Sequence, residues 1–402
     1  MNEGSDPRRL DGVSRRAVAG LAVTQIIGWG TTFHLPAVLG SVMAPSIGVS
    51  MEVLFGGISM QLLASALVAP RVGRRIDRMG GRAIMVAGSV LLAVALVLIA
   101  LAHGPILYFI GWALIGLATP MTLGAGTQAS LVQVAGPSAR RAVSVLLFFT
   151  GLPSFFFWPL ASWLEPMIGW RHTTLLFAAM HLLICVPIHL AVLRRRIPVR
   201  LSADGTAMEE GLPPRARRGA FWLLATVLAF AGMISWGVAL NIIELLKASG
   251  LSPTTAVFIA TLAAPIQAAA RIVEFMFGGR YPATITALVS AAVMPLGFVA
   301  MLIGGGSVWA AAMFVACYGV SNGLMTLARA TIPLALFGRG EYGTWTGRLT
   351  TPQNLIFAAS PVVFAALLQR QGPDVMTWAG LAMAVGCLIA MVLLARYARR
   401  HR

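Results

Sequence analysis

Long apolar runs alternate with short polar segments along the whole chain. Each run has the roughly 20 predominantly apolar residues that a helix needs to cross the hydrocarbon core of a bilayer. The pattern predicts an all-α membrane protein with twelve transmembrane helices, at 17–42, 51–70, 83–103, 105–133, 142–164, 173–193, 219–246, 253–277, 281–303, 307–335, 345–369 and 375–396.

Composition supports this prediction, and the remaining sequence lacks the motifs of an enzyme or a metal site. Of the 402 residues, 58% are hydrophobic and only 11% are charged, against about 25% charged in a soluble domain. Residues 1–17 are polar and lack the pattern of a cleaved signal peptide, so we expect the first helix to be retained. The sequence has no Walker loop, Ser/His/Asp constellation or metal-ligand spacing. We therefore expect no enzyme, no cofactor and no metal site.

The formal charge of +17 has two possible explanations, a nucleic-acid partner or the topology of a membrane protein. A nucleic-acid binder would carry its basic residues on a folded, water-facing surface. Here they cluster in the short segments between apolar runs, and alternate segments hold few of them. The positive-inside rule then predicts both termini in the cytoplasm, in what we expect to be a bacterial inner membrane. We expect no nucleic-acid partner. The few outer basic residues are Arg171, Lys247 and Arg370.

The chain divides near its middle. The longest polar segment, 194–218, predicts a cytoplasmic linker between an N-terminal six-helix bundle at 1–193 and a C-terminal one at 219–402. Short sequences recur in the same order in both halves, which indicates tandem duplication, a known transporter plan. The recurring pairs are Gly28-Trp29-Gly30 with Ser235-Trp236-Gly237, Gly48-Val49-Ser50 with Gly250-Leu251-Ser252, and Gly81-Arg82 with Gly279-Arg280.

The polar loop between the second and third runs carries the most specific motif. It reads Gly73-Arg74-Arg75-Ile76-Asp77-Arg78-Met79-Gly80-Gly81-Arg82 and resembles the G-x-x-x-D-R-x-G-x-R loop of the major facilitator superfamily. The resemblance implies a two-bundle fold and a secondary carrier. Glycines permit close backbone approach, and an acid can pair with an Arg and with a helix N-terminus. We expect a conformational latch built from Gly73, Asp77, Arg78, Gly80 and Arg82.

Other stretches resemble the bacterial monocarboxylate-porter-like branch of that superfamily. They are Gly28–Phe33 in the first run, Pro265–Arg271 in the eighth and Tyr318–Leu324, running on to Arg329, in the tenth. In such porters an Asp-x-x-x-Arg pair in helix eight binds the substrate carboxylate and a proton. Gln267 and Arg271 occupy that spacing here, and residues four apart share a helix face.

Arg271 is the first candidate for solute binding, because an ionisable group inside a span costs about 2.5–3.5 kcal/mol and is rarely without function. The alternatives are an ion pair with Glu274 or snorkelling to the inner headgroups. Arg329 is a second candidate, with snorkelling again the alternative. Gln267 cannot carry a proton, and Ala37 replaces the porters' Lys after Pro36. His34 is then the nearest titrating group, either a proton site or a hydrogen-bonded cavity residue.

Uncharged polar groups inside spans complete the candidate site. Thr32, Gln128 and Asn322 are expected to line a central cavity. Seven prolines inside spans are expected to be able to kink their helices: Pro36, Pro120, Pro153, Pro159, Pro265, Pro352 and Pro361. The three cysteines are expected to be small buried thiols, and His181 and His189 to be structural.

The sequence thus favours a secondary carrier that works by alternating access on a small organic anion, such as a monocarboxylate. The expected partners are the small-molecule solute, a proton or other coupling ion and the lipid bilayer, and we expect a monomer. One alternative is an efflux carrier for a neutral or hydrophobic toxicant, a drug or a trivalent arsenical, which the missing acid and Lys favour. Another, of a different class, is a non-transporting membrane sensor.

Overall fold

A computed structural model describes residues 10–193, 211–277 and 281–401, and the regular secondary structure in these ranges is helical throughout. Of the predicted linker, residues 194–210 lie outside the described ranges. The helices are α1 (Gly12–Thr31), α2 (Leu35–Ile47), α3 (Met51–Met79), α4 (Gly81–Ala100), α5 (Pro105–Thr122), α6 (Ala125–Ala135), α7 (Ala139–Phe149), α8 (Pro153–Met180), α9 (Val186–Val192), α10 (Pro214–Ala248), α11 (Pro253–Thr261), α12 (Ala263–Phe277), α13 (Ala283–Gly304), α14 (Val308–Phe337), α15 (Tyr342–Gln371) and α16 (Pro373–His401), with a short 3₁₀ helix at Gly136–Ser138 and a π-helical turn at His181–Cys185.

Twelve passes account for these helices. Ten apolar helical stretches in the described ranges are long enough to cross a membrane. One of them, Pro105–Val192, is 88 residues long and is interrupted at Gly124, Gly136 and Gly169, with φ of 51°, 53° and 76°. The break at Gly124 lies inside a run of membrane length, whereas Gly136 and Gly169 separate runs of that length. This stretch therefore holds three passes. The predicted all-α membrane protein with twelve spans is confirmed.

Four of the twelve passes are interrupted within the span, and each break lies close to a proline. Proline lacks an N–H group and clashes with the carbonyl four residues before it. Phe149 and Thr261, four positions before Pro153 and Pro265, are the last residues of α7 and α11. Thr32, four positions before Pro36, directly follows the last residue of α1. The fourth break, at Leu123 and Gly124, follows Pro120. The predicted kinks at these prolines are confirmed, whereas Pro159, Pro352 and Pro361 lie within continuous helices.

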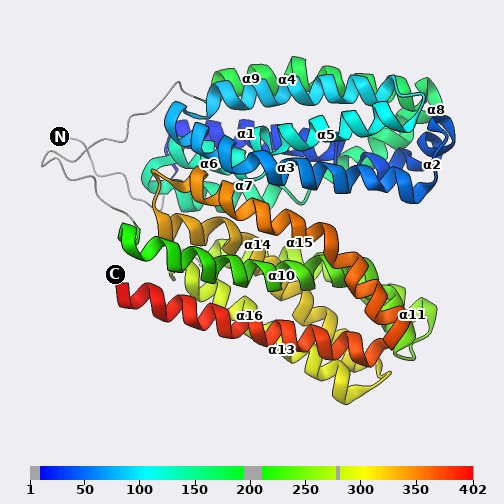
Figure 1. Cartoon of the computed structure of the whole chain (residues 1–402), viewed down its shortest axis with the longest axis vertical. Coiled ribbons are helices and arrows are strands. Elements are labelled where there is room, and N and C mark those ends of the chain that lie inside the picture. The colour runs from blue at the N-terminus through cyan, green and yellow to red at the C-terminus, as the bar shows by residue number, and fades with distance from the viewer. Residues whose placement is uncertain (1–9, 194–210, 278–280, 402) are drawn as a thin grey trace, which may run out of the picture. The chain divides into compact units, whose positions relative to one another are not determined.

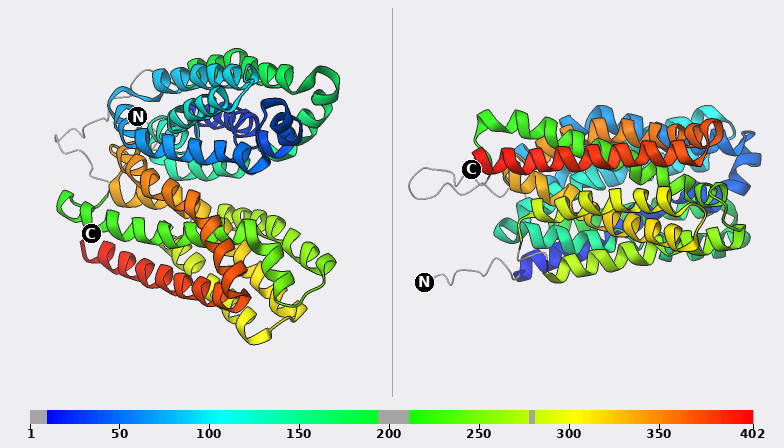
Figure 2. Two further views of the ribbon diagram at one scale, coloured as in Figure 1. Left: turned by 45° about the vertical axis from the view of Figure 1, so that its right-hand side comes forward. Right: turned by 90° about the horizontal axis from the view of Figure 1, so that it is seen from below.

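The described chain forms two compact units (Figures 1 and 2). The first consists of residues up to Met208 together with Arg339–Asn354, and the second of Glu209–Gly338 with Leu355–Arg402. The division differs from simple chain order, because the first turns of α15 pack with the first unit. The predicted bundle boundaries at 1–193 and 219–402 take no account of this exchange and remain a prediction.

Each unit has its own apolar core of long helices lying side by side. In the first unit Trp112 and Tyr108 of α5 are fully buried against α3 and α4, and the Tyr108 hydroxyl donates to the Leu54 carbonyl at 2.6 Å. In the second unit Phe298 of α13 and Phe314 of α14 occupy the corresponding place. Cys185, Cys317 and Cys387 are free and buried, as predicted.

The recurring sequences make the same local structures in both units. Gly48 and Gly250 have positive φ and close one helix, and Ser50 and Ser252 cap the next by accepting a backbone N–H. Gly30 lies against the ring of Phe157, as Gly237 lies against the ring of Phe364. The Gly279-Arg280 pair lies outside the described ranges. These matched contacts support the predicted tandem duplication.

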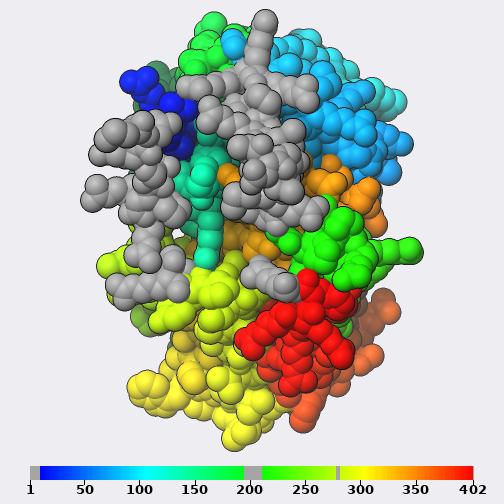
Figure 3. Space-filling view, turned by 90° about the vertical axis from the view of Figure 1, so that its left-hand side faces the viewer, coloured from blue at the N-terminus to red at the C-terminus, as the bar shows by residue number. Residues whose placement is uncertain are grey.

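Basic side chains close the last helix of the chain. The final turn of α16 carries Arg399, Arg400 and His401 and forms part of the surface in Figure 3. Cations at a helix C-terminus are favoured by its dipole. The same placement agrees with a water-facing helix end, which the positive-inside prediction requires.

Candidate functional site

Arg271 lies inside the eighth span and has no acidic partner in the part of the chain that the structure describes. Its Nη2 donates to Gln267 Oε1 at 3.1 Å, one helical turn earlier, and its buried Nε has no hydrogen-bond partner among the described residues. Glu274 does not pair with it and accepts from the Thr286 hydroxyl of α13 at 2.7 Å. The alternative in which Glu274 neutralises Arg271 is therefore wrong.

Arg329 of α14 is held by an aromatic stack. Its Cζ lies 5.0 Å from the ring centroid of Phe357, and Phe357 stacks on Trp236 with centroids 5.0 Å apart. A guanidinium over a ring face is attracted to the ring's quadrupole. The Nε of Arg329 is buried without a hydrogen-bond partner in the described ranges. The stack orients the cation and leaves its donors unused.

Two glycines bring α12 and α14 together. A Cβ at Gly319 would meet Ile266, and one at Gly323 would lie 2.6 Å from the Gln267 carbonyl oxygen. The two helices therefore approach backbone to backbone, as small residues permit in membrane helix pairs. Arg271 lies on α12 and Arg329 on α14, so this packing places the two arginines on adjoining helices.

The polar side chains around the two arginines present donors. Asn322 Oδ1 accepts from the Ser235 hydroxyl at 2.5 Å, so its amide nitrogen is the group that donates, and the Tyr318 hydroxyl interacts with the same side chain. Gln267 Oε1 is likewise occupied by Arg271, which leaves the Gln267 amide nitrogen to donate. Asn322 and Arg329 are seven residues apart and share one face of α14. The second unit thus collects two guanidiniums and two amide donors without a described carboxylate against them.

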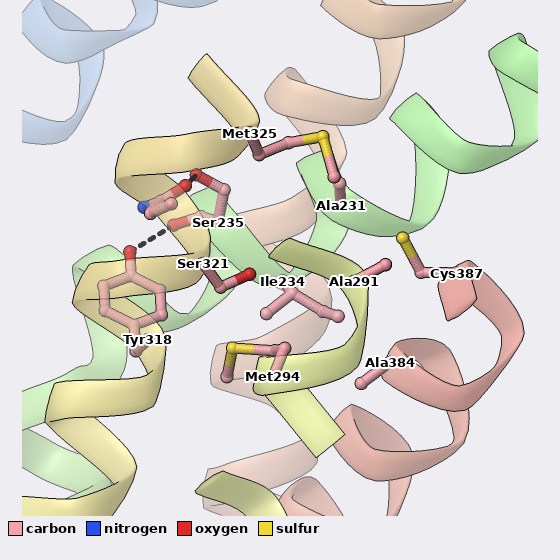
Figure 4. Close-up of a pocket in the computed structure, with 11 residues that line it drawn as sticks. Ala231, Ile234, Ser235, Ala291, Met294, Tyr318, Ser321, Met325, Ala384 and Cys387 are labelled. Carbon is pink, nitrogen blue, oxygen red and sulfur yellow. Dashed lines mark hydrogen bonds between the residues drawn. The ribbon is translucent and has the colours of Figure 1, made fainter. Parts of the chain in front are cut away.

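A small cavity adjoins these residues between α10, α13, α14 and α16 (Figure 4). Tyr318 donates across it to the Ser235 carbonyl at 2.8 Å, and Asn322, Met294 and Met325 line it. The cavity volume is about 20 Å³. That volume holds a water molecule and excludes an organic anion. The cavity can hydrate Asn322, but it is not by itself a solute site.

In the first unit the candidate residues surround the break between α1 and α2. Thr32 is buried and donates to the Gly28 carbonyl at 2.6 Å. The His34 ring contacts the rings of Phe33 and Trp158, at centroid distances of 5.5 and 6.2 Å. Among the described residues His34 makes ring contacts in place of the hydrogen bond that one hypothesis expected.

Gln25 joins the break in the fourth span to α1. Its Nε2 donates to the Thr122 carbonyl at 2.9 Å and to the Thr127 hydroxyl at 2.8 Å, and its Oε1 accepts from Gly124 N at 3.1 Å and Trp29 Nε1 at 3.3 Å. Backbone groups freed inside a membrane must find partners within the protein. Gln25 supplies them, which explains how the interruption is tolerated.

A buried histidine supports the end of α1. Thr31 donates its hydroxyl hydrogen to the Ile27 carbonyl at 2.8 Å, so it accepts from His181 Nε2 at 2.9 Å. His181 opens the π-helical turn of the sixth span, and His189 contacts Ser89 at 3.1 Å. Both histidines are fully buried and bonded within the bundle, which is the structural role predicted for them.

The loop motif meets the start of α15 within the first unit. Asp77 accepts from Gly343 N at 2.9 Å, Thr344 N at 2.6 Å and the Thr344 hydroxyl at 2.7 Å. A helix N-terminus has unpaired N–H groups and a positive dipole end, so a carboxylate fits there. Gly73 lies directly against the Gly343 carbonyl, where a Cβ has no room. Asp77 thus binds a helix N-terminus, as expected, and no described arginine.

The other motif residues take no part in that contact. Arg78 is exposed, Arg82 is half-buried, and Gly80 ends α3 with φ of 85°. Gln128 lies nearby on α6 and accepts from the Tyr342 hydroxyl of α15 at 3.2 Å. Gln128 therefore contacts the start of α15 rather than the arginines of the second unit.

Replacing Asp77 with Asn should lower the thermal unfolding temperature in detergent by several degrees, because the substitution removes a charge and an acceptor from the α15 N-terminus. Loss of such a cap costs about 0.5–2 kcal/mol. The matched control is Asp374→Asn, which removes an exposed acid from the first turn of α16. Equal shifts for the two variants would contradict the assigned contact.

Comparison with known proteins identifies the family. The model of the Major Facilitator Superfamily matches residues 21–344. The chain belongs to the Major Facilitator Superfamily. It is a secondary transporter of that superfamily, and the predicted fold class, with two pseudo-symmetric six-helix bundles, is confirmed. No curated protein sequence matches the chain.

Solved structures of the superfamily share the fold over nearly the whole chain. The human organic anion transporter MFSD10 (TETRAN) matches with a TM-score of 0.72 and 16% identity, over 94% of this chain and 99% of the other. The E. coli fucose:proton symporter FucP matches with a TM-score of 0.65 and 14% identity, over 95% and 98%. At these identities the likeness shows the fold and leaves the solute open.

Sequence reasoning missed the residues that hold the arginines. In the sequence Trp236 belongs only to a recurring Ser-Trp-Gly segment, and no pattern marks Phe357 as a binding residue. Phe357 contacts Arg329, and Trp236 stacks on Phe357, from distant positions in the chain. Gly319 and Gly323 belong to the Tyr318–Leu324 stretch, which resembles the monocarboxylate-porter-like branch. Their spacing of four residues was the available sign of a close helix contact.

Proposed function

We propose that this transporter carries a small organic anion, with a monocarboxylate as the first class to test, bound by Arg271 and Arg329 and flanked by Gln267 and Asn322. The observation that carries the proposal is the pair of span arginines with unsatisfied buried Nε groups and no described acidic partner. Buried cations of this kind require an anion. The guanidinium fork fits a carboxylate with two parallel hydrogen bonds.

The donors around the arginines distinguish this proposal from export of a neutral toxicant. Gln267 and Asn322 both have their amide oxygens occupied, so they offer hydrogens to the same solute. An apolar solute would leave all of these donors unpaired, at a cost of about 1–3 kcal/mol for each. Likeness to the human organic anion transporter agrees with the proposal but shows the fold alone. Assignment to the monocarboxylate-porter-like branch remains a prediction.

In this proposal the contact of Asp77 with the start of α15 opens and closes during the transport cycle. Alternating access moves the two halves about a central site, and a carboxylate on a helix N-terminus is a contact that can form and break as a unit. Gly73 permits the close approach. Gly80, Arg78 and Arg82 shape the same loop. His34 stays the candidate for a coupling proton, and both termini are proposed to be cytoplasmic.

The test is counterflow in proteoliposomes loaded with an unlabelled solute and diluted into the labelled one. A panel should include short monocarboxylates, dicarboxylates and neutral sugars. We expect uptake of at least one anion, and a loss of at least about tenfold in Arg271→Ala, since a charge-assisted hydrogen bond contributes about 1.5–3 kcal/mol. Arg370→Ala, at an exposed helix end, is the matched control. Uptake that Arg271→Ala leaves unchanged would overturn the role of Arg271.

A further inference from the structure

The charge balance of the second unit points to a solute with two negative charges. We propose that the carried anion is a dianion of the dicarboxylate class, with Arg271 and Arg329 each neutralising one charge. This inference rests on the proposed function, because it refines which anion the same residues bind. It starts from the number of positive charges inside the spans and the number of acids able to balance them.

Neither arginine contacts an acidic side chain among the described residues. Arg271 contacts the neutral Gln267, and Arg329 contacts the neutral ring of Phe357. Glu274, the acid next along the helix from Arg271, is turned toward Thr286. The remaining acids of the chain lie at helix ends, at kinks or in polar segments, as Asp77 and Glu52 do at the two ends of α3. Within the described ranges, therefore, no carboxylate contacts either of these two cations.

A single negative charge would leave one cation unbalanced. The two arginines stand on helices that Gly319 and Gly323 bring into backbone contact, and like charges repel strongly where water is excluded. In a site closed to water, an uncompensated charge is far more costly than in solution. A solute with two carboxylates compensates both charges and accepts hydrogen bonds from both guanidiniums. A solute with a single carboxylate compensates only one of the two charges.

The experiment compares solutes that differ by one charge on the same skeleton. Malonate, succinate and glutarate, each with its monomethyl ester, compete with labelled succinate in the counterflow assay at about pH 7.5, where every free carboxyl is ionised. For the wild type we expect the best dicarboxylate to inhibit at a concentration at least about tenfold lower than its ester. Arg329→Gln should reduce this preference to less than about twofold, and Arg329→Lys, which keeps the charge, should retain it.

Each outcome decides one of the two claims. Esters or monocarboxylates that compete as well as the dicarboxylates overturn the dianion and leave the anion carrier standing. A preference that survives Arg329→Gln also overturns it, because Arg329 then balances no solute charge. A wild type that moves neutral solutes and is inhibited by no anion overturns the proposed function itself. The Arg329→Lys variant shows that a lost preference reflects charge and not a misfolded protein.

Discussion

Replacing Gln267 with Asp should weaken binding of the carried anion at neutral pH by at least about tenfold. The side chain at this position already contacts Arg271, because Gln267 Oε1 accepts from Arg271 Nη2 at 3.1 Å. A carboxylate there would supply the negative charge that Arg271 lacks, and the solute would have to displace it. Close charge pairs in desolvated sites couple by about 1.5–7 kcal/mol, and each 1.4 kcal/mol is a factor of ten in affinity.

Gln267→Asn is the control for this prediction, since it has the size of Asp and carries no charge. The measurement is the solute concentration that gives half-maximal counterflow for the two variants and the wild type. We expect Asn to stay within a few-fold of Gln and Asp to differ from both. Equal values for Asp and Asn would mean that Arg271 does not contact the solute.

Exchange of the anion should be at least about tenfold faster than its net efflux. When the site is empty, Arg271 and Arg329 have no described counter-charge. Returning the empty carrier then means closing two uncompensated cations away from water, and each span arginine costs about 2.5–3.5 kcal/mol on insertion scales. The loaded carrier is free of that cost because the solute balances the charges. Alternating access therefore favours exchange over one-way transport.

This second prediction is measured as loss of labelled anion from preloaded proteoliposomes, with and without unlabelled anion outside. External anion should accelerate the loss strongly in the wild type. In Arg329→Gln the acceleration should be smaller, because only one cation remains to be closed away. An efflux rate that external anion does not change would rule out the charge argument.

The sequence was sufficient for the parts of the fold that depend on local chemistry. Apolar runs of membrane length gave the twelve passes. Pro36, Pro153 and Pro265 gave breaks in their helices, because a proline acts on the carbonyl four residues earlier. Gly136 and Gly169 also separate successive spans, but the sequence alone did not distinguish them from other glycines, and only their positive φ shows that a helix ends there.

The partners of the candidate residues could not be predicted, since they come from distant parts of the chain. Asp77 binds Thr344, which is 267 residues away, and nothing near either residue indicates the other. Gln128, expected to line a central cavity, accepts a hydrogen bond from Tyr342, which is 214 residues away. Arg271 was found because a charge inside an apolar run is conspicuous. The contact of Glu274 with Thr286 could not be predicted, because Thr286 lies on the next helix.

The most direct test of the account measures equilibrium binding of the carried anion to purified protein in four forms: the wild type, Arg271→Gln, Arg329→Gln and the double variant. If both guanidiniums hold one solute, each single substitution weakens binding by about tenfold or more, and their effects are not additive in the double variant. Arg370→Gln should bind as the wild type does. Single variants that bind with the affinity of Arg370→Gln would contradict an anion site built from Arg271 and Arg329.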